Sequence, residues 1–170
     1  TLSTTSYNIP IYVVDSNNPS QEYANFESKD NRVIYKKDLV QYTTGRIPLP
    51  KYAQPAGGGD KSFAVYDRAT GMMREYFHAV KDEKGTWHFS ASGYFKAKPN
   101  FKDLGKDNFA MQHTTGGSAV VCMLNPLSQI GIAEARKGEI KHALSFTIAN
   151  AGKGFSYPAK QGDGTSTNPN

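Results

Sequence analysis

Hydrophobic and polar positions alternate along this chain in short runs, and this pattern predicts β-strands more often than helices. A period of two is typical of a strand with one buried face, and Gly, Pro, Asn and Asp separate the runs. Pro10 lies within the first run and favours either an edge position or a strand start there. The predicted strands of the first half cover residues 7–14, 32–35, 61–67, 72–80 and 86–95.

The strongest local signal is a three-stranded meander over residues 61–95. Its strands are joined by turns at 68–71 and 81–85. In the first turn the Asp67 carboxylate can accept backbone N–H bonds, and Gly71 can adopt a positive φ. The long connection over 47–59 carries several Pro and Gly residues and is predicted to be irregular.

The second half contains one good helical stretch, Ile132–Lys137, with Gly138 as its C-terminal cap. The next ten residues, 139–148, alternate again and predict a long strand. We also expect a short strand at 155–158. One face of the long strand would carry Ile140, His142, Leu144, Phe146 and Ile148.

These elements predict a mainly β fold, a β-sandwich or jelly-roll-like domain with one short helix near 130–137. Strands and helices do not alternate, so a doubly wound fold is not expected. Residues 1–160 are predicted to form a single β domain. Residues 161–170 are predicted to form a polar loop or linker, which could lead into a further C-terminal segment of the same precursor.

Composition is compatible with one folded domain. The chain has 170 residues, of which 38% are hydrophobic and 12% aromatic, and this excludes a disordered chain. No apolar run reaches the length of a membrane-spanning helix. No signal peptide is visible at the N-terminus, so the chain is either intracellular or trimmed. Cys122 is the single cysteine, which excludes an internal disulfide and a cysteine-based metal site.

Charge is distributed unevenly along the chain. The net charge is +5, from 20 basic and 15 acidic side chains. Residues 1–30 carry one lysine against four acidic residues, a net −3, whereas 31–61 carry +4 and 134–160 carry +3. No block of five like charges occurs, so no nucleic-acid partner is expected. A mildly basic face would suit an anionic polysaccharide or cell wall, and a solvated surface without a partner is the alternative.

Six stretches together resemble a family of secreted microbial β-rich, jelly-roll-like proteins. The resemblance implies an exported, extracellular protein with a carbohydrate-related role, and it supplies no catalytic residues. The stretches are Tyr-x-Ile-Pro-Ile-Tyr-Val-Val (7–14), Ile-Pro-Leu-Pro with Pro-x-Gly-Gly-Gly-Asp (47–60), Ala-Val-Tyr-Asp-x-Ala-Thr-Gly-x-x-x-Glu (64–75), Gly-x-Trp-His (85–88), Ala-Arg-Lys-Gly-Glu-Ile-Lys-His-Ala-Leu (135–144) and Tyr-Pro-Ala…Asp-Gly-Thr-Ser-Thr-x-Pro (157–169).

Two carboxylates are the first candidates for chemistry. Glu75 and Asp67 lie on adjacent predicted strands, and a carboxylate pair about 5–9 Å apart would suit glycoside hydrolysis. Glu75 is the better candidate because it shares a face with Met73 and Phe77, where a carboxylate usually has a partner or a purpose. The alternative is structural: Asp67 caps the turn, and Glu75 pairs with Arg68 or with water.

Histidines are the second candidates. His113 precedes a Gly-rich turn, and His142 lies on the apolar face of its predicted strand. With Glu75 they could form a general acid–base cluster or a site of two histidines and one carboxylate. No His-x-His spacing is present, so no metal ligand is assigned and the cofactor stays open. His142 as an ordinary core histidine is the alternative.

Aromatic and polar side chains are the candidates for sugar binding, because sugar rings stack on aromatic faces. Alternation places Trp87 toward the core and His88 toward a groove, which weakens the stacking role of Trp87. Lys141 could neutralise a uronate carboxylate. The predicted substrate-binding residues are Tyr76, Trp87, His88, Tyr94, Lys141, Tyr157 and Asp163.

These observations predict a secreted protein that acts on polysaccharide or cell-wall glycan, either a hydrolase or a lyase. A non-catalytic carbohydrate-binding module is one alternative and would need exposed aromatics. A structural, self-assembling extracellular protein made from a processed chain is another. It would need an open sheet edge or an exposed apolar patch.

Overall fold

A computed structural model describes residues 6–29, 41–96, 119–121, 124–156, 159 and 162–167. These residues are mainly β, with one short α-helix among them. The predicted strand at 32–35 lies outside the described residues, as do His113, Cys122 and Tyr157. The elements are β1 (Ile11–Val14), β2 (Tyr23–Ser28), β3 (Gly45–Pro48), β4 (Phe63–Asp67), β5 (Met72–Phe77), β6 (Val80–Lys81), β7 (Trp87–Phe89), β8 (Ala91–Lys96), the 3₁₀ turn η3 (Asn125–Ser128) and the helix α2 (Ile132–Lys137).

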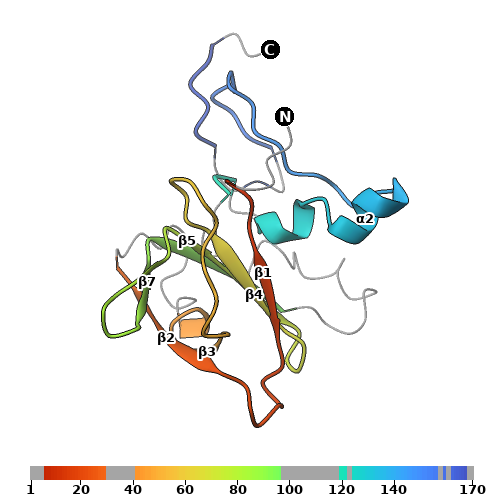
Figure 1. The fold of residues 1–170 in the computed structure, drawn as a ribbon. Helices are drawn as coiled ribbons and strands as arrows, with labels where there is room; N and C mark the ends of the chain where they lie inside the picture. Colours follow the sequence, from red (N-terminus) through yellow and green to blue (C-terminus); the bar gives the residue numbers. More distant parts are fainter. Residues whose placement is uncertain are drawn as a thin grey trace.

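The strands form two mixed sheets of four (Figure 1). The first has the order β1-β4-β5-β8, in which β1 runs parallel to β4 and the other neighbours are antiparallel. The second has the order β3-β2-β7-β6, in which β2 and β7 are parallel. Both positions that Pro10 indicated are seen, because β1 is an edge of the first sheet and begins at Ile11, directly after Pro10. The strand β3 was missed, since its prolines had indicated an irregular connection.

The predicted meander is correct for β4, for the first turn and for β5, although β5 ends at Phe77 and not at Val80, which belongs to β6. It is wrong for its third strand. Residues 86–95 do not form one strand: β7 belongs to the second sheet, and β8 returns to pair with β5 in the first. The change of partner occurs between two adjacent residues. The Phe89 carbonyl accepts from Lys29 N–H, whereas Ser90 N–H donates to the Phe77 carbonyl, both at 3.0 Å. One extended segment thus joins the two sheets.

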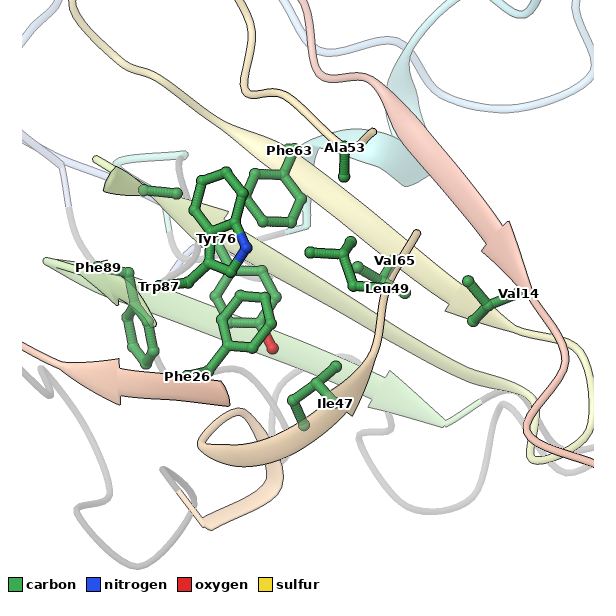
Figure 2. Close-up of a cluster of buried hydrophobic side chains, with 11 residues drawn as sticks. Val14, Phe26, Ile47, Leu49, Ala53, Phe63, Val65, Tyr76, Trp87 and Phe89 are labelled. Carbon is green, nitrogen blue, oxygen red and sulfur yellow. The ribbon is translucent and has the colours of Figure 1, made fainter. Parts of the chain in front are cut away.

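The main core lies between the sheets and is rich in aromatic rings (Figure 2). Phe26 of the second sheet stacks on Tyr76 of the first at a ring-centroid distance of 4.4 Å. Trp87 lies 5.1 Å from the Phe63 ring and is only 2% exposed, so its predicted core position is confirmed. The Tyr76 hydroxyl donates to the Thr43 carbonyl at 3.0 Å, which satisfies the one polar group of that ring.

The second half follows the prediction only as far as the helix. The helix α2 spans Ile132–Lys137 as expected, and Gly138 ends it in the left-handed region at φ 69°. The predicted strand over 139–148 is wrong: these residues form no strand and are exposed, and in Figure 1 the chain after α2 runs away from the sheets. Phe155 and Ser156 form no strand either. No helix in the described ranges is long and apolar enough to cross a membrane.

Candidate functional site

The two predicted catalytic carboxylates lie on opposite faces of the first sheet. In the β4–β5 ladder Asp67 pairs with Met72, and Glu75 pairs with Ala64. Asp67 and Ala64 are three residues apart on one strand, so their side chains point to opposite faces. The pair that glycoside hydrolysis needs is therefore not formed by Glu75 and Asp67.

Asp67 organises the turn between β4 and β5. Its Oδ1 accepts the backbone N–H of Ser16 at 3.0 Å and of Ala69 at 3.1 Å, and its Oδ2 accepts the hydroxyls of Ser16 and Thr70, both at 2.8 Å. Burial alone raises the pKa of this carboxyl, but the hydrogen bonds from Ser16, Thr70 and Ala69 outweigh it, and the pKa is lowered. This geometry agrees with the structural alternative, in which Asp67 caps the turn between β4 and β5.

Glu75 is fully buried on the other face of the sheet, between Ala64 and Gly93 of the neighbouring strands. It lies beside a small apolar cluster that contains Met73, as its predicted face required. Its Oε2 accepts the backbone N–H of Asn125 at 3.2 Å, where η3 begins. The carboxylate thus holds the chain after Leu124 against the sheet.

His142 does not lie in an apolar environment, so that prediction is wrong. It is partly exposed beyond α2, where Nε2 lies 3.1 Å from Glu134 Oε1 and Nδ1 lies 2.8 Å from the Ala143 carbonyl. The hydrogen bonds with Ala143 and then with Glu134 raise the pKa of this imidazole. His113 lies outside the described residues. Within the part of the chain that the structure covers, no three His, Cys, Asp or Glu side chains group as a metal site requires.

The predicted sugar-stacking aromatics are core residues. Tyr76, Trp87 and Tyr94 are all buried, so a sugar ring cannot reach their faces. Burial raises the pKa of the Tyr76 hydroxyl far above its usual range. His88 lies on the outer face, as alternation predicted, and its Nε2 lies 3.0 Å from Asp82 Oδ2. Tyr157 lies outside the described residues.

A cavity with a basic lining lies beside the first residues of β2, Tyr23–Asn25, which precede the part of β2 that pairs with β7. Its volume is about 390 Å³, and we call it the basic hollow. Among the described residues its charged lining side chains are all cations, and they come from β3, from the loop after β3, from β6 and from the turn after β6. The lining residues are Tyr23, Ala24, Asn25, Arg46, Leu49, Pro50, Lys51, Lys81, Lys84, Gly85 and Trp87.

Aromatic rings hold two of these cations in place. The Arg46 guanidinium lies 4.3 Å from the centre of the Tyr23 ring, and Lys81 Nζ lies 5.1 Å from that of the Trp87 ring. Such cation–π contacts position a charge without neutralising it. Lys51 is different, because its Nζ lies 3.2 Å from Glu22 Oε1. Bonds from the Lys51 backbone and side chain lower the pKa of Glu22.

Trp87 also lines the hollow, but its Nε1–H is buried. This donor has no hydrogen-bond partner among the described residues, and a buried donor without a partner costs free energy of the order of 1–3 kcal/mol. The basic hollow therefore presents four cations, one of which, Lys51, is paired with Glu22.

Sequence reasoning missed this site. Arg46 and Lys51 belong to the stretch 31–61 whose net charge of +4 was noted, but Lys81 and Lys84 were read only as turn residues. The polar residues that were chosen lie elsewhere. Lys141 is exposed and paired with Glu139 at 3.2 Å, and Asp163 is exposed in the C-terminal loop.

Comparisons with known proteins add no further information on the site. The chain matches no protein-family model, no curated protein and no solved structure. The resemblance to secreted jelly-roll-like proteins thus stays a prediction from its motifs.

Proposed function

We propose that this protein is a secreted carbohydrate-binding protein that takes an anionic glycan in the basic hollow. The observation that carries the proposal is the convergence of Arg46, Lys81 and Lys84, with Lys51 in its pair with Glu22, on one cavity that is lined by no acidic side chain of the described residues. Several cations around a cleft raise the local concentration of an anionic ligand. We further propose that the two sheets form a sandwich of the jelly-roll type.

The chemistry of the hollow favours a sugar acid. Arg46 presents a planar guanidinium of the kind that binds carboxylates with two parallel hydrogen bonds. A volume of about 390 Å³ falls within the range of small-molecule sites and would hold one or two sugar units.

The proposal contains no catalytic step. Hydrolysis by Glu75 and Asp67 would need both carboxylates on one face, and the sheet register separates them. Proton abstraction by His142 with Lys141 would need both near the glycan, but each is paired with an acid beyond the sheets. A binding role depends on none of these groups. It does not use the exposed aromatics that the sequence-based binding module required, since Tyr76, Trp87 and Tyr94 are buried, and it relies on the cations of the hollow instead.

The test is binding of the whole chain to polysaccharides that differ in charge. We expect binding to polygalacturonate in affinity electrophoresis and calorimetry, and none to neutral dextran. Binding should weaken as salt rises from about 0.05 to 0.5 M, because exposed cations are screened over a shorter distance. Equal affinity for the neutral and acidic polymers, or no affinity for either, would contradict the proposal.

A further inference from the structure

The segment over residues 139–148 is held beside α2 by side-chain contacts. It belongs to no strand and is exposed throughout. Gly138 ends the helix in the left-handed region at φ 69°, where a glycine is not strained. The chain turns there, and His142 comes to lie against Glu134, eight residues earlier in the sequence.

Both ring nitrogens of His142 face acceptor oxygens. Nδ1 lies 2.8 Å from the Ala143 carbonyl oxygen, and Nε2 lies 3.1 Å from Glu134 Oε1 and 3.2 Å from Oε2. A carbonyl and a carboxylate have no hydrogen to donate, so each contact needs an N–H group from the ring. A neutral imidazole has one N–H, whereas an imidazolium has two. The geometry therefore fits the charged form of His142.

Glu134 keeps a second bond that does not depend on His142. Its Oε2 accepts the backbone N–H of Gly131 at 2.9 Å, at the start of α2. The hydrogen bonds from Gly131 and then from His142 lower the pKa of this carboxyl, so it stays ionised at neutral pH. The start of α2 is thus retained when His142 loses its proton.

Glu134 is also the charged group that acts on the His142 ring among the described residues. The other charged side chains of the neighbouring elements are Arg136 and Lys137 of α2 and Glu139 and Lys141 of the segment itself. Glu139 and Lys141 pair with each other at 3.2 Å, and η3 brings no charged side chain.

The segment has a second attachment, which does not titrate. Ser145 N–H donates to the Ser128 carbonyl at 3.1 Å, and the Ser145 hydroxyl donates to Asn125 Oδ1 at 3.3 Å. None of these groups gains or loses a proton between about pH 5 and 9. The contact of His142 with Glu134 is therefore the one that responds to pH in this range.

We propose that His142 is a pH-sensitive clamp: with two ring protons it holds residues 139–144 against α2, and with one it releases them while Ser145 stays on η3. The hydrogen bonds with Ala143 and then with Glu134 raise the pKa of His142 above its usual 6.5. The clamp is therefore complete below about pH 6.5 and is lost as the pH rises through the raised pKa. This inference is independent of glycan binding and does not involve the basic hollow.

Nuclear magnetic resonance on the whole chain tests the clamp. We expect the His142 ring signals to titrate with a midpoint above 6.5, and the order parameter of the Ala143 methyl axis to fall between pH 6 and 9, from about 0.85 toward about 0.6. The Ala135 methyl group in α2 is the internal control and should not change. His142→Gln should abolish the change at Ala143, whereas His88→Gln removes a histidine that contacts another acid, Asp82, and should keep it.

Two glutamate variants separate the contact from the general charge. Glu134→Gln retains an oxygen for Gly131 N–H but loses its charge, and should lower the His142 midpoint by about 0.3 to 0.7. Glu139→Gln removes the same charge near His142 without touching it, and should lower the midpoint less than half as much. A midpoint at or below 6.5, equal order of Ala143 at pH 6 and 9, a change that persists in His142→Gln, or equal effects of the two glutamate variants would overturn the proposal.

Discussion

Replacing Asp67 with alanine is expected to lower the free energy of unfolding by about 2 kcal/mol, because the change leaves several partly buried donors without their acceptor. Four hydrogen bonds end on this carboxylate, two of them from backbone N–H groups. They join the β4–β5 turn to the chain after β1, so the loss affects two segments together. Urea unfolding at pH 7 measures the change.

Asp67→Asn is the matched control for this prediction. The amide oxygen can keep both backbone bonds of Oδ1, and the hydroxyls of Ser16 and Thr70 can rotate to accept from the amide nitrogen. We expect the free energy of unfolding to fall by about 1 kcal/mol, since the hydrogen bonds are kept but no longer end on a charged group. Alanine and asparagine variants of equal stability would show that the hydrogen bonds of Asp67 contribute nothing.

The same carboxylate predicts a pH dependence. Its pKa is lower in the folded protein than in the unfolded chain, where it is about 3.9. Its contribution to stability is therefore complete above about pH 5 and is lost as the pH falls through the folded pKa. The stability difference between wild type and Asp67→Asn should be constant from pH 7 to 5 and shrink toward pH 3. A constant difference down to pH 3 would contradict the assignment.

Reversing two charges in the basic hollow is expected to weaken binding of polygalacturonate by at least about tenfold. Lys81 and Lys84 both line the cavity from the β6–β7 segment, and neither is in an ion pair with a described residue. A Lys81→Glu/Lys84→Glu variant would turn an attractive potential into a repulsive one at the ligand. Calorimetry at about 0.1 M salt measures the affinity.

A second double variant separates the site from the net charge. Lys29→Glu/Lys141→Glu changes the charge of the protein by the same amount, but neither residue lines the hollow. Lys29 lies just beyond the far end of β2. We expect this variant to bind within about twofold of wild type. Equal losses in the two variants would mean that general charge, and not the hollow, determines binding.

Much of the fold could be predicted because local signals decide it. Alternation identified β4, β5 and the inward face of β7, and the composition of Ile132–Lys137 with Gly138 identified α2. The division of residues 86–95 between the sheets was not visible. The apolar–polar alternation of the sequence continues through Ser90, whereas in the structure the hydrogen-bond partners change there and Ser92, not Ala91, is buried. Strand partners are fixed by tertiary contacts, which this local pattern does not contain.

The candidate site was less predictable because it depends on register. Glu75 and Asp67 were placed on neighbouring strands correctly, but their faces follow from the Asp67–Met72 pair that closes the turn. A shift of one residue would have put them on the same face. The basic hollow combines residues from three separate segments, so no spacing along the chain could reveal it.

The predicted strand over 139–148 shows the opposite error. A period of two describes which side chains would share a face if a ladder existed, but it does not provide the neighbouring strand. Residues 139–148 have the pattern without the neighbour in this structure. Helix α2 needed no such partner, since its hydrogen bonds lie within the segment.

The parallel pairings have a consequence for the order of events in synthesis. Both N-terminal strands, β1 and β2, find parallel partners roughly 50 to 60 residues further along, in β4 and β7. Neither can complete its ladder with that partner until that later segment has left the ribosome. During synthesis β1 and β2 therefore emerge before the strands they pair with in parallel. Structures of such high contact order form slowly. Expression at low temperature, or with holding chaperones, should therefore raise the soluble yield of this protein.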